Sequence, residues 1–316
     1  MDDDFFEDAF ADSEEVKEES TNVLPDPSQL PTSFENRAIL EARMQGLLEP
    51  DSVPGVVCEG PFDFFEVYAG CSRLSLAVKK KGLSVLPPIE LKEGFDMCER
   101  PLFMSLLGMV RAKRIRFIWV APPCTTFSLA RTPKLRNLKT PWGFDVLRPK
   151  VVGGNLHAFQ ALLLCLVQVF VGGFFGAEQP AWGFMRALPV WVLFRFLGCL
   201  EILFDWCRFD CWFKKTTRLL SNFGPMKKLG KRCHRNFRHV KLEGSATTQA
   251  GAYSPCFCRH FADLLFANKC LLEHGSKTFE DFSSLDSAPR EIPLSKPPVL
   301  REEERCSLTH YKPSGG

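Results

Sequence analysis

The chain has 316 residues, 45% of them hydrophobic, which excludes a wholly disordered protein and leaves room for one large domain or two small ones. Residues 1–20 hold ten acidic side chains and one basic one, so the rest carries 39 basic against 27 acidic side chains, an excess that favours nucleic acid as a partner. The 13 irregularly spaced cysteines and the acidic N-terminus exclude a secreted disulfide scaffold and predict free thiols in a reducing, intracellular compartment.

The N-terminal part of the chain changes character near residue 30. Residues 1–30 are acidic and then rich in proline and serine, so we expect a disordered tail. Thr32 to Glu35 has the spacing of a capping box, and leucine and methionine side chains follow at helical intervals. A helix is therefore predicted within residues 31–50, before a main domain that covers residues 52–221.

The main domain alternates between strand-like and helical segments. We expect a strand over 62–68, a helix from Leu74 to Gly82, and a second strand over 83–86 that leads to Glu90. A helix opened by Pro101 and a strand over 115–120 follow, and then a basic loop over 129–150.

The second half of this domain repeats the alternation. It contains an apolar helix over 155–171, a strand over 173–177, a helix over 191–197 and strands over 201–207 and 216–221. This order predicts an α/β fold with a doubly wound, mostly parallel sheet and an antiparallel pair at its end. The segment between Lys150 and Glu178 has no charged side chain, but Gln160, Gln168 and a Gly-Gly break favour a fully buried helix over a membrane span.

A basic segment follows the sheet. Residues 208–241 contain eleven basic side chains and one acidic one, with aromatic residues between them, which suits either nucleic-acid contact or a solvated face. We expect a small basic module over 222–275 and a disordered tail over 276–316. Zinc binding in this module is an open alternative, with the candidate ligands Cys233, His234, His239, Cys256, Cys258 and His260. Their spacing is not that of a standard zinc finger, so we favour free thiols and phosphate-facing histidines and predict no metal site.

Three positions at predicted strand ends have side chains suited to chemistry. Cys124 follows two prolines that stiffen the exit of a strand, and it is either a nucleophile or a small buried residue. Glu178 follows a long apolar run, so it would either hold a proton or face water. Gly70 lies in a strand-to-helix turn, and Glu90 follows the next strand. This layout is that of a nucleoside-cofactor site or of an ordinary strand-helix-strand turn.

These segments together resemble the DNA (cytosine-5) methyltransferases over about residues 60–221. The segments are E-V-Y-A-G-C-S-R-L-S at 66–75, the acid Glu90, P-P-C-T-T-F-S at 122–128 and E-Q-P at 178–180. The resemblance implies a Rossmann-like sheet of the S-adenosylmethionine-dependent methyltransferase type. It also implies that Cys124 attacks C6 of a flipped cytosine, that Glu178 protonates or hydrogen-bonds N3, and that C5 then takes the methyl group. The implied S-adenosylmethionine site comprises Tyr68, Gly70, Glu90, Asp96 and Pro122.

The resemblance also implies where the substrate binds. We expect DNA rather than RNA, in the nucleus, with contacts from Ser128, Arg131, Arg136, Lys214, Lys215 and Arg218. The compact pattern is similar to methyltransferase-like domains carried by retroelements, and we expect a monomer without membrane contact. Ser72-Arg73 replaces the family's Gly-Gly, and Gln179 stands where asparagine is usual. Two alternatives stay open: an inactive module that binds nucleic acid, and a methyltransferase that acts on RNA or a small molecule.

Overall fold

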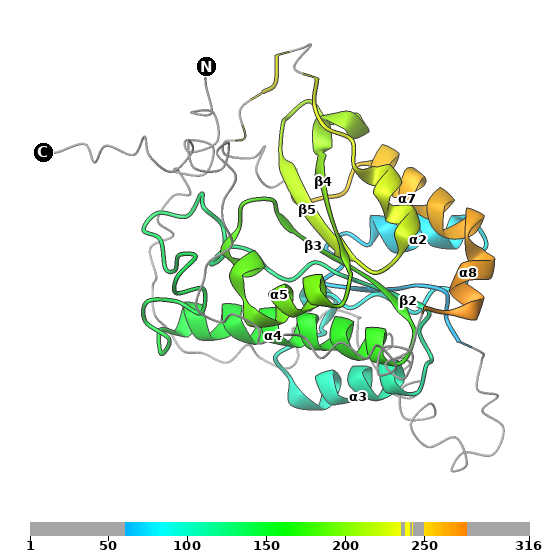
Figure 1. The fold of residues 1–316 in the computed structure, drawn as a ribbon, viewed down its shortest axis with the longest axis horizontal. Coiled ribbons are helices and arrows are strands. Elements are labelled where there is room, and N and C mark those ends of the chain that lie inside the picture. The colour runs from blue at the N-terminus through cyan, green and yellow to red at the C-terminus, as the bar shows by residue number, and fades with distance from the viewer. Residues whose placement is uncertain (1–60, 235–237, 241, 243–249, 277–316) are drawn as a thin grey trace, which may run out of the picture.

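The structure, a computed structural model, describes residues 61–234, 238–240, 242 and 250–276 (Figure 1). One five-stranded sheet has the order β1-β2-β3-β5-β4. Its strands are β1 (Phe65–Val67), β2 (Phe117–Val120), β3 (Phe174–Pro180), β4 (Leu200–Asp205) and β5 (Thr216–Ser221). The first three pair in parallel, and β5 lies antiparallel between β3 and β4. The predicted mixed sheet, parallel at its start and antiparallel at its end, is thus confirmed.

The parallel strands are apolar because both faces of the sheet are covered. All four residues of β2, Phe-Ile-Trp-Val, are buried. The register aligns Val67 with Val120, and Val120 with Ala177. The carboxyl ends of β1, β2 and β3 therefore meet at one edge of the sheet, where open α/β sheets bind their ligands.

Helices cover both faces of the sheet, as the alternation of segments predicts. Helices α3 (Arg100–Arg111), α4 (Pro149–Phe170) and α5 (Pro189–Phe196) lie on one face (Figure 1). Helices α2 (Arg73–Lys80), α7 (Pro255–Ala267) and α8 (Lys269–His274) lie on the other. Short 3-10 helices connect these elements: η4 (Leu91–Glu93), η5 (Phe184–Ala187), η6 (Trp206–Phe209) and η7 (Gly224–Leu229).

Helix α4 is the apolar segment that the sequence singles out. By length and composition alone it is long and apolar enough to cross a membrane. Its inner side, with Ala158, Leu162 and Val169, belongs to the core that it shares with β3 and α5. Val152 and Phe159 on its other side are exposed. The expectation of a fully buried helix is therefore wrong, because the sheet and its neighbouring helices cover only one side of α4.

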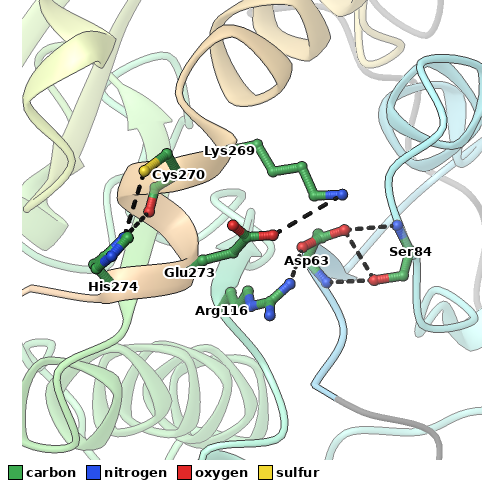
Figure 2. Close-up of polar contacts among 7 residues, drawn as sticks. All are labelled: Asp63, Ser84, Arg116, Lys269, Cys270, Glu273 and His274. Atoms are coloured by element: carbon green, nitrogen blue, oxygen red, sulfur yellow. Dashed lines mark hydrogen bonds and ion pairs between the residues drawn. The ribbon is translucent and has the colours of Figure 1, made fainter.

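The segment predicted as a second strand over 83–86 forms only isolated bridges, which join Val85 to Phe64 and Ile89 to Val67. Polar contacts hold this segment in place (Figure 2). Asp63, which is buried, accepts hydrogen bonds from the Ser84 backbone N–H (2.9 Å) and hydroxyl (3.0 Å), and it pairs with Arg116. This anchor lies at the amino end of β1, at the edge opposite the strand ends that carry Cys124 and Glu178.

Helix α7 is an element that the sequence analysis does not predict, and it packs directly on the sheet. Phe257 and Phe261 are buried in one cluster with Phe64, Trp119 and Phe204. The described part of residues 222–275 therefore shares a hydrophobic core with the sheet across the predicted boundary at 221. The predicted helix within 31–50, the predicted tail over 1–30 and all but the first residue of the predicted tail over 276–316 lie outside the described residues.

Candidate active site

The Cys124 loop leaves β2 in a tight turn. The Cys124 carbonyl accepts hydrogen bonds from the backbone N–H groups of Phe127 (2.8 Å) and Ser128 (2.9 Å). The Gln179 side chain, at the end of β3, donates to the Pro122 carbonyl at 2.9 Å. The loop is thus attached to the end of the neighbouring strand β3.

Arg136 contacts the Cys124 loop from the protein interior. Its guanidinium lies 3.7 Å from the centre of the Phe127 ring. It also donates to the Thr126 hydroxyl (3.0 Å), the Asn155 side chain (2.7 Å) and the Pro141 carbonyl (2.8 Å). Arg136 has no exposed surface. Its predicted role in nucleic-acid contact is therefore wrong for this structure, and Arg136 instead positions the loop that carries Cys124.

Glu178 follows four buried residues of β3, which pairs with the antiparallel strand β5. The Thr217 hydroxyl hydrogen-bonds to its carboxyl group. The other carboxyl oxygen, Oε1, is buried and has no hydrogen-bond partner among the described residues. Burial raises the pKa of Glu178, against the opposing effects of Lys215 and Thr217. The arrangement favours a carboxylic acid that keeps its proton at higher pH than an exposed glutamate does.

Lys215, which immediately precedes β5, links Cys124 to Glu178 electrostatically. Burial raises the pKa of the Cys124 thiol, the Lys215 ammonium lowers it, and Glu178 raises it again. The same ammonium lowers the pKa of Glu178. Lys215 also donates to the Ala250 carbonyl at 3.3 Å. A lysine predicted to contact nucleic acid thus acts on both predicted catalytic residues, and no sequence signal marks this.

The turn after β1 brings Gly70 to Glu90. The Gly70 backbone N–H donates to the Glu90 carboxylate at 2.7 Å. Gly70 has a φ of +57°, and no atom lies within 4 Å of the position that a Cβ would take there. A ligand can approach the backbone closely at such a turn, and the partly exposed Glu90 offers an acceptor for hydroxyl groups. Gly70 and Glu90 keep their predicted cofactor-binding role as an expectation.

Tyr68 and Asp96 belong to a second group of polar side chains beside this turn, which also includes His157 and Cys98. The Tyr68 hydroxyl lies 3.4 Å from His157 Nδ1 and donates to the His157 carbonyl at 3.3 Å. Cys98 Sγ lies 3.5 Å from Nε2 of the same ring, and Asp96 accepts from the Cys98 backbone N–H at 2.8 Å. Burial lowers the pKa of His157, and Asp96 raises it. His157 lies in the long helix α4, so its place beside Tyr68 could not be read from the sequence.

A buried acid and a tyrosine complete the region on the α2 and α7 face. Glu66 accepts from the Ser75 backbone N–H (2.9 Å) and hydroxyl (2.6 Å), which ties β1 to helix α2. The Tyr253 hydroxyl accepts from Trp119 Nε1 at 2.9 Å. Burial raises the pKa of Tyr253, as do Glu178 and Glu66. Tyr253 therefore lies close to both acids and holds the start of α7 against the strand ends.

The remaining residues predicted to bind nucleic acid separate into two groups. Arg218 is buried, and it donates to the Ala181 carbonyl (3.0 Å) and to Glu201 (2.6 Å) on the neighbouring strand β4. Its predicted role as a nucleic-acid contact is therefore wrong for this structure, because its guanidinium joins β5 to β4 inside the protein. Ser128, Arg131 and Lys214 are partly exposed and keep their predicted role as an expectation.

A cavity of about 340 Å³ lies at the start of α7, and neither Cys124 nor Glu178 lines it. Its walls include Arg73, Asp210, Trp212 and Ser254. Cys124 and Glu178 are each only partly exposed. A substrate ring must therefore reach them from the exposed side of the Cys124 loop, where Pro123 and Thr125 face solvent.

Replacing Glu66 with glutamine should make stability less dependent on pH. Burial raises the pKa of Glu66 from 4.5 to about 7, so the folded chain holds a proton that the unfolded chain loses. The free energy of unfolding of the wild type should therefore fall as the pH rises from about 4.5 to about 7, the interval between the two pKa values of Glu66. Urea unfolding should show Glu66→Gln gaining about 3 kcal/mol over wild type between about pH 4.5 and about pH 8.

The matched control for this measurement is Glu273→Gln, an exposed acid of helix α8 that pairs with Lys269 (Figure 2). Its difference from wild type should stay small at every pH, because exposed ion pairs contribute little. A Glu66→Gln difference that does not change with pH would show that Glu66 is not held protonated in the fold.

Comparison with known proteins gives a distant structural likeness. No family model matches the sequence, and no curated protein matches it. Among solved structures, the S. pombe Dnmt2 methyltransferase superposes with a TM-score of 0.30 at 8% identity. The superposition covers 57% of this chain and 57% of that one. The matched part thus spans little more than half of the length of that protein.

Proposed function

We propose that this chain is an S-adenosylmethionine-dependent methyltransferase that modifies C5 of cytosine in DNA through a covalent bond to Cys124. The observation that carries the proposal is the placement of Cys124 and Glu178. Cys124 follows β2, Glu178 lies near the carboxyl end of the neighbouring parallel strand β3, and each is electrostatically coupled to Lys215. The sheet would then be Rossmann-like, of the methyltransferase type, with its reactive groups at the carboxyl edge.

Each of the two side chains has a distinct task in this reaction. The Cys124 thiol loses its proton to solvent, and the thiolate adds to C6 of the ring. Protonated Glu178 gives its proton to N3, so the ring carries no net negative charge and C5 becomes electron-rich. After C5 has been methylated, its proton leaves to water, the C5–C6 double bond reforms with loss of the Cys124 thiolate, and Glu178 recovers its proton from N3.

The environment of each residue suits its task. The raised pKa of Glu178 keeps a proton available for N3. The Lys215 ammonium favours the thiolate of Cys124, against the effect of burial. Arg136, which contacts Phe127 and Thr126, keeps the loop in one conformation, so Cys124 stays at the strand end.

The cofactor would bind at the turn after β1. Gly70 leaves open space beside the backbone, and Glu90 would accept hydrogen bonds from ribose hydroxyls. Tyr68, Asp96 and Pro122 lie around the same edge and would form the rest of the site. When bound, S-adenosylmethionine supplies an electrophilic methyl group on a sulfonium ion.

The substrate follows from charge and from the chemistry of the target. The excess of basic side chains outside residues 1–20 favours a polyanion. A cytosine must leave the base stack to reach Cys124, which is only partly exposed. DNA as the substrate implies a nuclear location, and the compact chain is consistent with a domain carried by a retroelement.

The test is covalent trapping on a DNA duplex that contains 5-fluorocytosine. Fluorine at C5 cannot leave as a proton does, so a productive enzyme stays bonded to the base. Denaturing electrophoresis should show an adduct that requires S-adenosylmethionine, and Cys124→Ala should abolish it. A control variant, Cys270→Ser, changes an exposed cysteine of α8 and should form the adduct normally. Normal cofactor binding with no adduct on DNA would overturn the proposal.

Two observations favour a second candidate, an inactive module that keeps the fold and binds nucleic acid. Burial raises the pKa of the Cys124 thiol, and the Glu90 carboxylate already accepts from the Gly70 amide. An inactive module would bind DNA with strong salt dependence and would show neither cofactor binding nor adduct. The same trapping experiment, with calorimetry for S-adenosylmethionine, separates the two candidates.

A further inference from the structure

Two cysteines and a histidine, one from the segment after β4 and two from the segment after β5, come together beyond the ends of these strands. The ligand atoms of Cys207, Cys233 and His239 all lie within 4.8 Å of one another. Cys233 Sγ is 3.4 Å from His239 Nε2, and Cys207 hydrogen-bonds to Cys233. We propose that these three side chains bind a zinc ion.

The distances suit tetrahedral coordination. Zinc binds cysteine sulfur at about 2.3 Å and histidine nitrogen at about 2.0–2.1 Å. Two such ligands on a tetrahedron are about 3.6 Å apart, close to the 3.4 Å between Cys233 and His239. Two thiolates and one imidazole form a donor set that selects zinc over magnesium or calcium. Of the residues that the structure describes, no fourth donor lies within the same distance.

Backbone contacts hold each segment near the site. Cys207 lies in η6, directly after β4. The Cys233 backbone N–H donates to the buried Asp205 carboxylate at 2.8 Å. The segment with His239 is joined to the chain before β5 by the Val240 N–H, which donates to the Trp212 carbonyl at 3.0 Å.

Asp205 is the common support of this cluster. One of its oxygens accepts from Arg232 Nε at 3.0 Å as well as from Cys233, and the other accepts from the Thr216 hydroxyl. A carboxylate that fixes the backbone of a ligand residue keeps the ligand oriented before the metal binds. Zinc would then join the ends of β4 and β5 to the basic segment that follows them. This role is independent of Cys124 and of the proposed reaction.

The experiment uses the full chain, purified with a non-chelating reductant that keeps the cysteines as thiols. Mass spectrometry of metals should find one zinc per chain after equilibration with zinc and removal of loosely bound ions with a weak chelator. Cys233→Ser and His239→Ala should each lower the zinc affinity by roughly 10-fold or more. His239→Ala matters most, because His239 is partly exposed and its loss removes no core side chain.

The matched control is the double variant Cys270→Ser, His274→Ala. This pair on α8 also places sulfur and nitrogen 3.5 Å apart, but it is exposed and has no third ligand among the described residues (Figure 2). It should keep the zinc stoichiometry of wild type. Cobalt substitution should give thiolate-to-cobalt charge-transfer absorption in wild type and in this control, and not in Cys233→Ser.

Two results would overturn the zinc site. The first is a wild-type chain that holds no more zinc than Cys233→Ser. The second is a control variant that loses as much zinc as His239→Ala, which would indicate adventitious binding to cysteines. Circular dichroism of each variant distinguishes the loss of a ligand from the loss of the fold.

Discussion

Replacing Glu178 with glutamine is expected to slow methyl transfer to DNA by roughly 10²–10⁴-fold, the usual contribution of a positioned acid or base. The amide has nearly the shape of the acid and can still accept from Thr217, so the strand pair β3–β5 should remain intact. It cannot give a proton to N3, and negative charge would then accumulate on the ring. The measurement is the single-turnover rate of methyl transfer to a cytosine-containing duplex.

The same variant should make the Cys124 thiol more reactive, which separates proton donation from a structural effect. Where Glu178 is ionised, at pH values above its raised pKa, it raises the pKa of Cys124. In that pH range the variant lacks this charge and should allow alkylation of Cys124 at lower pH than wild type. The rate of alkylation, followed by mass spectrometry of the Cys124 peptide, should rise while methyl transfer falls. If both rates fall together, the fold around the loop has changed and the assignment of Glu178 as the acid fails.

Glu273→Gln is again the matched control, because it makes the same chemical change at an exposed site far from the strand ends. It should leave both rates at the level of wild type. An unchanged rate of methyl transfer in Glu178→Gln would also contradict the role of Glu178, since no other acid of the described residues shares its electrostatic coupling to Cys124.

Replacing Trp119 with alanine is expected to lower the free energy of unfolding by about 3–5 kcal/mol, as large-to-small changes of buried aromatic residues do. Trp119 has no exposed surface. Its ring lies 5.0 Å from that of Phe261 and 6.0 Å from that of Tyr253. A Cβ at Gly176 would come within 2.7 Å of the indole, so glycine leaves the space that the ring fills.

Two further variants show which interactions of Trp119 account for the lost free energy of unfolding. Trp119→Phe keeps a ring but leaves the Tyr253 hydroxyl without its donor, and it should cost about 1–3 kcal/mol. Trp212→Ala removes an exposed indole and should change stability by less than about 1 kcal/mol. Denaturant unfolding of all three measures the differences. A loss in Trp119→Ala no greater than in Trp212→Ala would contradict the packing of α7 on the sheet.

Local patterns in the sequence predict much of the sheet and the position of the cysteine. Runs of aromatic and β-branched residues predict β2 and β5 because such side chains suit a strand that is buried on both faces. Two prolines stop β2 and hold Cys124 on a stiff turn, and the apolar run before Glu178 predicts its desolvation. These effects act between residues that are close in the chain.

The arginines show where such local reasoning fails. Arg136 and Arg218 look like surface cations in a basic chain, but both are buried, because partners distant in sequence satisfy their guanidinium groups. Composition counts charges and does not reveal which of them have such partners. Lys215 also has an environment that the composition does not reveal. It acts on Cys124, on the loop after β2, and on Glu178 in β3.

The sequence by itself thus determined the alternation of strands and helices, the free thiols, and the placement of Cys124, Glu178 and Gly70 at strand ends. Only the tertiary structure decided that β5 inserts between β3 and β4, and this brings Lys215 and Thr217 to Glu178. It alone placed α7 on the sheet and joined Cys207 to Cys233 and His239. The physical reason is that strand order and packing depend on contacts between distant segments, which no local periodicity records.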